Sequence, residues 1–210
     1  MLRHLPLLSP VPRHQRAHLV VPAAFSADEC DRIVSLCEPE PAEPATLEGV
    51  EHVGTTRSSS VSWLPADEDT WWIYDRLGEL AVDANEHWGF ELVGFEEELQ
   101  YTRYDGPGDH YAWHRDGLDG EVSTRKLSIV VQLTPPEHYE GGALEFPDLG
   151  DQHDPFFGVT DGPHRSAAAE EFSQLGTAVM FRAFEYHRVT PLNSGRRRSL
   201  VAWVAGPPFR

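Results

Sequence analysis

Apolar residues in the first half of the chain recur at helical spacing in two segments. The first segment begins at Ser26, and Glu29 follows three positions later, which is the signature of a capping box at a helix start. The second segment runs from about Asp67 to Trp88, with an apolar residue every three or four positions. The predicted buried faces consist of Phe25, Cys30, Ile33, Val34 and Cys37 in the first helix, and of Ile73, Leu77, Leu80, Ala84 and Trp88 in the second.

After the second predicted helix the pattern changes to that of β-strands. Short alternating or β-branched runs are bounded by Gly, Pro or Asn, which favour turns. Two helices followed by many short strands predict a mainly β (α+β) fold, in which helices pack on the outside of an all-β sandwich or barrel. Strands are predicted at 98–104, 126–134, 142–146, 177–181, 187–192 and 199–205, and earlier ones at 17–22 and 58–64.

The 210 residues are enough for one domain with a substantial core. We predict a loose N-terminal extension over 1–16 and an N-terminal strand with supporting helices over 17–95. A β core is predicted over 96–210, and it forms one structural domain with the preceding part. The segment 147–175 is long, polar and irregular, which is typical either of a functional lid or of a disordered segment.

The composition narrows the class of partner. A formal net charge of −17 argues against binding to nucleic acid, whose phosphates require clusters of Lys and Arg. The same charge would attract a cationic partner, although simple solubility explains it as well. No stretch is long and apolar enough to span a membrane, and the N-terminus lacks the continuous apolar run of a signal peptide. The sequence does not determine the oligomeric state.

The two cysteines of the chain, Cys30 and Cys37, both fall within the first predicted helix. At a rise of about 1.5 Å per residue, their Cα atoms would lie roughly 10 Å apart, which is too far for a disulfide. We therefore expect free thiols and a cytoplasmic protein, because disulfides are rare in the reducing cytosol.

The stretch YAWHRDGL places His114 two residues before Asp116. In an extended segment, residues at this spacing project from the same face, so both side chains can reach one metal ion. The motif is weak on its own, because a chain with 11 histidines and 34 acidic residues contains such a pair by chance. The Gly and Pro residues at 106–109 disfavour a helix, so His110 and His114 are not expected to form a zinc pair.

A second group of candidate residues lies near the C-terminus. His187 opens a predicted strand, and Arg197 and Ser199 follow on one face of the next strand. Two histidines and one aspartate can occupy one face of Fe(II) and leave three positions for a 2-oxo acid and O2. Arg197 can bind the distal carboxylate of that acid with two parallel hydrogen bonds. The neighbouring Arg196 and Arg198 point the other way and are interpreted as surface charge.

Four longer stretches occur together in one order: HLVVPAAFSADECDRIVSL, LQYTRYDGPGDHYAWHRD, LSIVVQLTPPEHYEGGALEF and HRVTPLNSGRRRSL. With these stretches the chain resembles the 2-oxoglutarate- and Fe(II)-dependent dioxygenases, specifically the prolyl-4-hydroxylase-like branch. The resemblance covers most of the chain. It implies a double-stranded β-helix (jelly-roll or cupin-like) core with the N-terminal helices packed on its outside.

The resemblance also implies roles for individual residues. Tyr104, ten residues before His114, corresponds to a tyrosine that lines the 2-oxoglutarate pocket, although a core aromatic at a strand end is the alternative. Ser199 is expected to assist the arginine that binds 2-oxoglutarate. The implied site residues are His114, Asp116 and His187 as catalytic Fe(II) ligands, and Arg197, Tyr104 and Ser199 as residues that bind 2-oxoglutarate.

By resemblance, the expected cofactors and co-substrates are Fe(II), 2-oxoglutarate and O2, and many relatives also use L-ascorbate. The expected reaction hydroxylates a C–H bond of an amino-acid, peptidyl (prolyl in the nearest relatives) or natural-product substrate and releases succinate and CO2. Asp116 favours hydroxylation, since halogenating relatives lack this carboxylate. Many prolyl hydroxylases have lysine in place of Arg197, and nucleic-acid demethylases have arginine in place of Trp203. The alternative from a different class is a non-catalytic β-barrel protein that binds a metal or another ligand.

A few other residues receive structural interpretations. We expect Trp71, Trp72 and Trp88 in the core of the second helix, and His18 at the surface. The glycines at 141–142 are expected in a tight turn where a side chain would clash, and 193–195 are expected to form a turn before the last strand.

Overall fold

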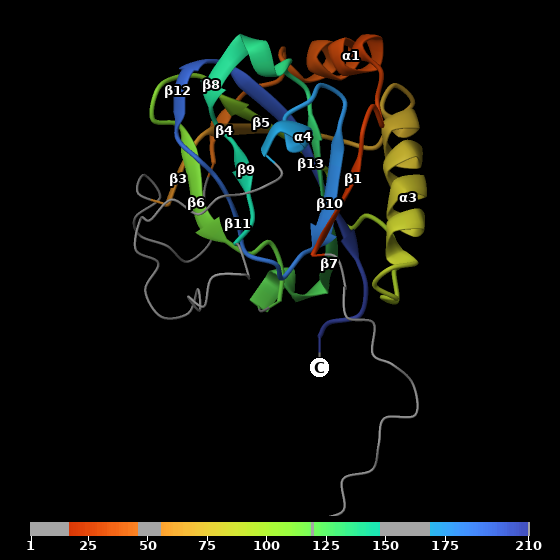
Figure 1. Cartoon of the computed structure of the whole chain (residues 1–210). Helices are drawn as coiled ribbons and strands as arrows, with labels where there is room; N and C mark the ends of the chain where they lie inside the picture. The colour runs from red at the N-terminus through yellow and green to blue at the C-terminus, as the bar shows by residue number, and fades with distance from the viewer. Residues whose placement is uncertain (1–16, 46–55, 119, 148–168, 210) are drawn as a thin grey trace, which may run out of the picture.

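The computed structural model describes residues 17–45, 56–118, 120–147 and 169–209, and most of its strands belong to two antiparallel sheets (Figure 1). The larger sheet has the order β1 (His18–Val21), β10 (Ala178–Arg182), β7 (Arg125–Gln132), β13 (Arg197–Ala205), β5 (Leu99–Tyr104), β4 (Ser60–Leu64) and β2 (Glu43–Pro44). The smaller sheet has the order β3 (Arg57–Ser58), β6 (His110–His114), β11 (His187–Val189) and β9 (Leu144–Glu145). Two further strands, β8 (Tyr139–Gly141) and β12 (Leu192–Gly195), pair with each other.

Helix α1 (Ala27–Cys37) begins where the capping box predicts it. The Ser26 side chain accepts a hydrogen bond from the backbone N of Glu29 at 3.3 Å, and the Glu29 carboxylate accepts one from the backbone N of Ser26 at 2.7 Å. These bonds satisfy two amide groups near the helix start that lack intrahelical partners. The helix buries three of its predicted apolar residues, Cys30, Ile33 and Cys37.

Helix α3 (Trp71–Asn85) is shorter than the predicted segment 67–88. At its start, the Asp67 carboxylate accepts hydrogen bonds from two backbone N–H groups that follow it, and this turn occupies the residues ahead of the helix. After its end, the Asn85 side chain bonds both backbone groups of Phe90 and closes the chain into a loop. Figure 1 shows α1 and α3 outside the two sheets, as predicted.

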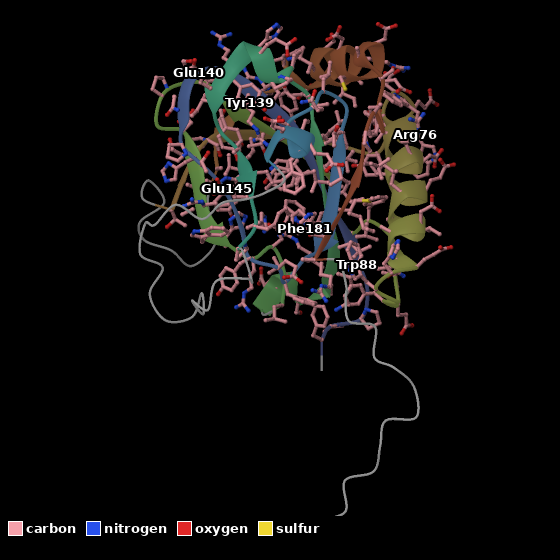
Figure 2. The ribbon with its side chains drawn as sticks, viewed as in Figure 1. Arg76, Trp88, Tyr139, Glu140, Glu145 and Phe181 are labelled. Carbon is pink, nitrogen blue, oxygen red and sulfur yellow. The ribbon has the colours of Figure 1, made fainter. Side chains whose placement is uncertain are left out.

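Two clusters of buried side chains stabilise this arrangement. The first cluster lies between the larger sheet and the helices, and it includes Ile33 of α1, Leu77 of α3 and Ile129 of β7. The second cluster lies between the two sheets, where the rings of Phe146 and Phe181 have centroids 5.0 Å apart; Figure 2 shows Phe181 inside the molecule. Full burial of one such side chain contributes roughly 1.5–3 kcal/mol, so both clusters contribute substantially to folding.

The residues predicted as a turn at 193–195 instead belong to β12, which pairs with β8. The close approach expected at Gly141 is confirmed: its φ is 78°, and a Cβ there would lie 2.3 Å from the carbonyl oxygen of Pro191. Gly195 has a φ of 81°, and a Cβ there would lie 2.2 Å from the carbonyl oxygen of His138. Glycine at both positions permits two backbones to approach more closely than any side chain would allow.

Two aromatic residues lie elsewhere than predicted. Trp71 is 57% exposed, because it is the first residue of α3 and lies outside the buried face, which starts at Ile73. His18 is half-buried instead of exposed, since its ring stacks on Phe146 with centroids 4.8 Å apart and meets Phe172 at 4.9 Å. Phe172 belongs to the short helix α4 (Ala169–Phe172), so α4 covers the end of β1.

The extension predicted over 1–16 and most of the segment 147–175 lie outside the described residues. Strands from both sides of residue 95 meet in the larger sheet, where β4 pairs with β5 over five residues. The described helices include none with the length and apolar composition that crossing a membrane requires.

The two cysteines are free and buried, as predicted. Burial raises the pKa of Cys30 to about 11 and that of Cys37 to about 12, so very little thiolate exists at neutral pH. We predict that iodoacetamide alkylates the folded protein at least about tenfold more slowly than the urea-unfolded protein, because thiolate and access are both lacking. Intact-mass spectrometry over time measures both rates, and equal rates would contradict the buried placement.

Candidate metal centre

A cavity of about 790 Å³ lies between the two sheets. Strands β5 and β13 of the larger sheet line one wall, and strands β6 and β11 of the smaller sheet line another. Polar and charged residues form much of its lining, with apolar residues such as Val130 and Val201 among them. Clefts of this size are typical binding sites for small molecules. All six site residues that the sequence indicates line this cavity: Tyr104, His114, Asp116, His187, Arg197 and Ser199.

Three of these residues converge on one point. His114 ends β6 and His187 begins β11, and the two are direct cross-strand partners. Asp116 follows two residues after β6, and its Oδ1 lies 3.4 Å from Nε2 of His114 while its Oδ2 lies 3.6 Å from Nε2 of His187. One ligand atom from each residue lies within 4.8 Å of the other two, so the group could hold a metal ion.

The second nitrogen of each imidazole has a backbone partner. Nδ1 of His114 lies 2.8 Å from the carbonyl oxygen of Ala112, and Nδ1 of His187 lies 3.0 Å from the carbonyl oxygen of Glu185. Since a carbonyl oxygen only accepts, both Nδ1 atoms carry the proton in these hydrogen bonds. In the neutral form of each ring, Nε2 then carries a free lone pair on the side that faces Asp116, as metal-binding histidines require.

Hydrogen bonds fix both the backbone and the side chain of Asp116. Its backbone N donates to the carbonyl oxygen of Ala183 at 2.9 Å, and the Ser128 hydroxyl donates to its Oδ2 at 2.7 Å. Burial acts to raise the pKa of Asp116, but His187, His114 and the bond from Ser128 together outweigh burial and hold the pKa below its ordinary value. The side chain is therefore a carboxylate at neutral pH.

His187 is prepared for the same role. Burial and the neighbouring His114 lower the pKa of His187 to about 4, against the opposing effect of Asp116. The ring is therefore neutral near pH 7, which is the protonation state in which imidazole binds metals. The Phe181 ring packs against His187 at a centroid distance of 4.5 Å and restricts the rotation of the imidazole.

A buried guanidinium lies along the cavity from these three residues. Arg197 is 1% exposed, and its Nη2 donates to Oε1 of Gln132 at 2.9 Å. Its Nη1 is also buried but bonds to no acceptor among the described residues. The guanidinium carbon lies 5.2 Å from the ring of Tyr104, the cross-strand partner of Arg197. Ser199 lies on the same face of β13, as its spacing from Arg197 predicts. The guanidinium of Arg197 can therefore bind an anion that enters the cavity.

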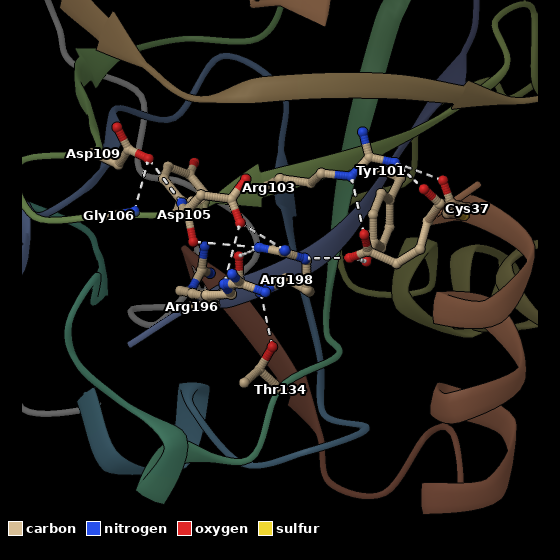
Figure 3. Close-up of polar contacts among 12 residues, drawn as sticks. Cys37, Tyr101, Arg103, Asp105, Gly106, Asp109, Thr134, Arg196 and Arg198 are labelled. Carbon is tan, nitrogen blue, oxygen red and sulfur yellow. Dashed lines mark hydrogen bonds and ion pairs between the residues drawn. The ribbon is translucent and has the colours of Figure 1, made fainter. Parts of the chain in front are cut away.

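The interpretation of Arg198 as surface charge is wrong. Arg198 is only 8% exposed, and it donates to Glu38 and to Asp105, each at 2.7 Å (Figure 3). The physical reason is that the last residues of α1 cover this part of the outer face of β13, where Glu38 follows the helix. Arg196 does have the predicted position, with its side chain 76% exposed.

This outer network supports the wall that carries Arg197. The Nη1 of Arg198 lies 3.4 Å from the carbonyl oxygens of both Tyr104 and Arg197, and its backbone N donates to the Thr134 hydroxyl oxygen at 2.8 Å (Figure 3). Arg103 donates to the carbonyl oxygen of Cys37 at 2.6 Å and so ties the end of α1 to β5. The strand positions behind the cavity are thus held from the opposite face of the sheet.

The sequence analysis did not single out three residues of the cavity region. Ser128 and Gln132 are polar residues at even spacing within the apolar run of β7, and this alternation could have indicated that they share one face. Arg57 lies on the short strand β3 and lines the cavity opposite Tyr111. A two-residue strand leaves no periodic signal, so nothing in the local sequence identifies Arg57.

Comparison with known proteins agrees with this architecture. A family model described as the 2OG-Fe(II) oxygenase superfamily matches residues 99–205. A PKHD-type hydroxylase from Klebsiella pneumoniae is 33% identical over 109 residues, which are 50% of this chain and 41% of the relative. Another, from Azoarcus, is 32% identical over 102 residues, which are 46% of this chain and 38% of the relative. The chain spans only about two fifths of the length of these relatives.

Solved structures show the same fold. A Pseudomonas putida prolyl-4-hydroxylase superposes with a TM-score of 0.66 at 22% identity, over 91% of this chain and 93% of that one. A prolyl hydroxylase from Trichoplax adhaerens, solved with a peptide of hypoxia inducible factor, has a TM-score of 0.66 at 15% identity, over 90% and 83% of the two chains. The predicted double-stranded β-helix fold is therefore confirmed.

The contrast between Arg198 and Arg196 gives a direct test of the outer network. We predict that Arg198→Met lowers the free energy of unfolding by roughly 1–3 kcal/mol, because it removes charge-assisted bonds from a buried site. The matched change Arg196→Met should alter it by less than about 0.5 kcal/mol, since that side chain is exposed. Urea denaturation followed by circular dichroism measures both values, and equal effects of the two changes would contradict the assigned burial.

Proposed function

Because this chain belongs to the 2OG-Fe(II) oxygenase superfamily, we propose that it is a 2-oxoglutarate-dependent hydroxylase whose Fe(II) is held by His114, Asp116 and His187. The observation that carries the proposal is the convergence of two imidazoles and one carboxylate in a cavity that also contains an incompletely bonded, buried guanidinium. The first group suits a divalent metal, and the second suits the far end of a keto diacid.

The ligand set fits Fe(II). Two imidazole nitrogens and a single carboxylate form the facial group typical of non-haem iron oxygenases, and they leave coordination positions open. Bound there, Fe(II) would supply the redox chemistry that couples decarboxylation of 2-oxoglutarate by O2 to hydroxylation of a C–H bond, with release of succinate and CO2. The protein fixes the ligands: the bond from Ser128 to Oδ2 of Asp116 keeps that carboxylate from rotating.

Arg197 is proposed to bind the distal carboxylate of 2-oxoglutarate. Its Nη1 lacks a protein acceptor within the described ranges, whereas Gln132 holds its Nη2, so the guanidinium is oriented before the anion arrives. Tyr104 lies against the guanidinium and Ser199 lines the same wall, which supports their proposed places in the 2-oxoglutarate site. Val130 and Val201 add apolar surface to this wall and limit the access of water.

The substrate class is a further part of the proposal. The relatives named above are PKHD-type and prolyl hydroxylases, which supports an amino-acid, peptidyl or natural-product substrate. A net charge of −17, with Trp203 in the cavity wall, favours a small molecule or peptide over a nucleic acid. L-Ascorbate is proposed as a reductant that would maintain activity over repeated turnovers.

The proposal predicts oxygen-dependent turnover. Protein loaded anaerobically with Fe(II) should develop weak visible absorption when 2-oxoglutarate is added, and it should release succinate once O2 is admitted. Succinate is quantified by mass spectrometry, with and without a panel of amino acids, peptides and small amines. Binding of metal without any consumption of 2-oxoglutarate would contradict the enzyme and favour a non-catalytic ligand-binding protein.

Substitutions should be able to remove Fe(II) binding and 2-oxoglutarate binding independently of each other. We predict that Asp116→Ala abolishes tight Fe(II) binding, because it removes the only anionic ligand of the proposed set. Arg197→Gln should weaken 2-oxoglutarate binding by about tenfold to a hundredfold while sparing Fe(II), because only the charge-assisted bonds to the distal carboxylate are lost. Anaerobic titrations that monitor metal and 2-oxoglutarate separately distinguish the two, and loss of both ligands in both variants would refute the assigned roles.

Ser128 should affect the affinity for Fe(II) although it is not one of the proposed ligands. We predict that Ser128→Ala weakens Fe(II) binding by roughly tenfold to a hundredfold, because Asp116 loses the bond that fixes its carboxylate. Ser62→Ala is a matched control, since Ser62 is equally buried but its hydroxyl bonds to no described residue. Competition with a fluorescent chelator measures the metal affinity, and an equal loss in the two variants would show that Ser128 has no specific role.

A further inference from the structure

The four buried arginines of the described ranges fall into two classes. Arg103 and Arg198 lie on the outer face of the larger sheet and pair with carboxylates of neighbouring residues. Arg57 and Arg197 line the cavity, and neither forms an ion pair with a described residue. The proposed function gives Arg197 an anion, the distal carboxylate of 2-oxoglutarate. It gives Arg57 none.

The guanidinium of Arg57 is fixed in position, but not all of its donors have partners. It is 6% exposed, and its Nε donates to the Ser59 hydroxyl at 2.9 Å. Its guanidinium carbon lies 4.4 Å from the ring centroid of Tyr111, and the Tyr111 ring in turn stacks on His114 at 3.3 Å. Its terminal nitrogens, Nη1 and Nη2, bond to no described residue. Because Arg57 lines the cavity, both nitrogens are available to an anion bound there.

The position of Arg57 separates it from the 2-oxoglutarate site. Arg57 lies on β3 beside β6 in the smaller sheet, whereas Arg197 lies on β13 in the larger one (Figure 1). Through Tyr111, Arg57 is one ring away from the proposed metal ligand His114. A group bound by Arg57 would therefore lie near the reacting centre but at a different wall from 2-oxoglutarate.

A carboxylate is the anion that best fits this guanidinium. Removing a cation from water is costly unless it is paired, and the two terminal nitrogens match the two oxygens of a carboxylate. A phosphate dianion suits the surroundings less well, because Glu96, Glu97 and Glu121 also line the cavity and would repel it. Of the other arginines in the lining, Arg125 is already paired with Glu97, and Arg197 is assigned to 2-oxoglutarate, so Arg57 suits a single negative charge.

We propose that Arg57 binds a carboxylate of the substrate, so that the enzyme selects a free carboxylic acid, such as an unblocked amino acid or the C-terminal residue of a peptide. A residue in the interior of a peptide offers no main-chain carboxylate and would leave Arg57 without its partner. This inference rests on the proposed function, since it names the class of substrate that the same cavity takes.

Binding to an unreactive complex tests the inference without knowledge of the true substrate. The protein is loaded with Zn(II) and N-oxalylglycine, an unreactive analogue of 2-oxoglutarate. Saturation-transfer NMR then measures the binding of the 20 common amino acids and of their C-terminal amides, with inorganic phosphate as a further probe. We expect at least one acid to bind about tenfold or more tightly than its own amide, and to lose this preference in Arg57→Gln.

Two further variants separate this role from a structural one. Arg57→Lys keeps the charge without the planar fork and should retain part of the preference. Arg76→Gln is the matched control, because Arg76 also stacks on an aromatic ring, that of Phe25, but lies on α3 (Figure 2) and should leave binding unchanged. If Arg57→Gln does not fold, Arg57→Lys and the comparison of acid with amide in the unaltered protein still decide the question.

Several results would overturn the inference. In the unaltered protein, these are the absence of any acid that binds in preference to its amide, or tighter binding of phosphate than of any acid. In Arg57→Gln, they are a preference for the acid that survives the change, or a loss of N-oxalylglycine binding instead of acid binding. Turnover of 2-oxoglutarate by the iron-loaded protein is measured in parallel. Turnover without an acid preference refutes only the role of Arg57, whereas absence of 2-oxoglutarate binding refutes the proposed function itself.

Discussion

The site depends on the register between β6 and β11. This register places His114 directly opposite His187, although the two residues are far apart in the sequence. Because side chains alternate along a strand, a slip of one residue would turn one of the two imidazoles to the opposite face of the sheet. The remaining parts of the centre follow from this pairing, since Asp116 leaves β6 two residues later and is fixed by Ala183 and Ser128.

Charge is distributed differently on the two faces of the larger sheet. On the outer face, Arg103 and Arg198 are neutralised by carboxylates, and their bonds tie α1 to β5 and β13. Arg197 on the inner face, and Arg57 across the cavity on the smaller sheet, lack such partners within the described part of the chain. The first arrangement stabilises the scaffold, and the second leaves positive charge available for small anions. Adjacent residues of one strand, Arg197 and Arg198, thus serve binding and support respectively.

The sequence was sufficient for the features that depend on local pattern. The capping box at Ser26, most of the strands and the shared strand face of Arg197 and Ser199 follow from spacing alone. The burial of Arg198 could not be predicted, because it depends on where the end of α1 packs. The pairing of β12 with β8 was missed for a related reason: Gly195 is a turn signal locally, but here it permits close approach of a distant strand.

The central claim is that His114, Asp116 and His187 together hold one Fe(II) ion beside the 2-oxoglutarate site. X-ray absorption spectroscopy at the iron edge of the anaerobically loaded protein tests it most directly. The account predicts a nitrogen and oxygen shell with outer scattering from two imidazole rings, and a change in that shell when 2-oxoglutarate is added. A spectrum without imidazole scattering, or one that is unchanged by 2-oxoglutarate, would contradict it.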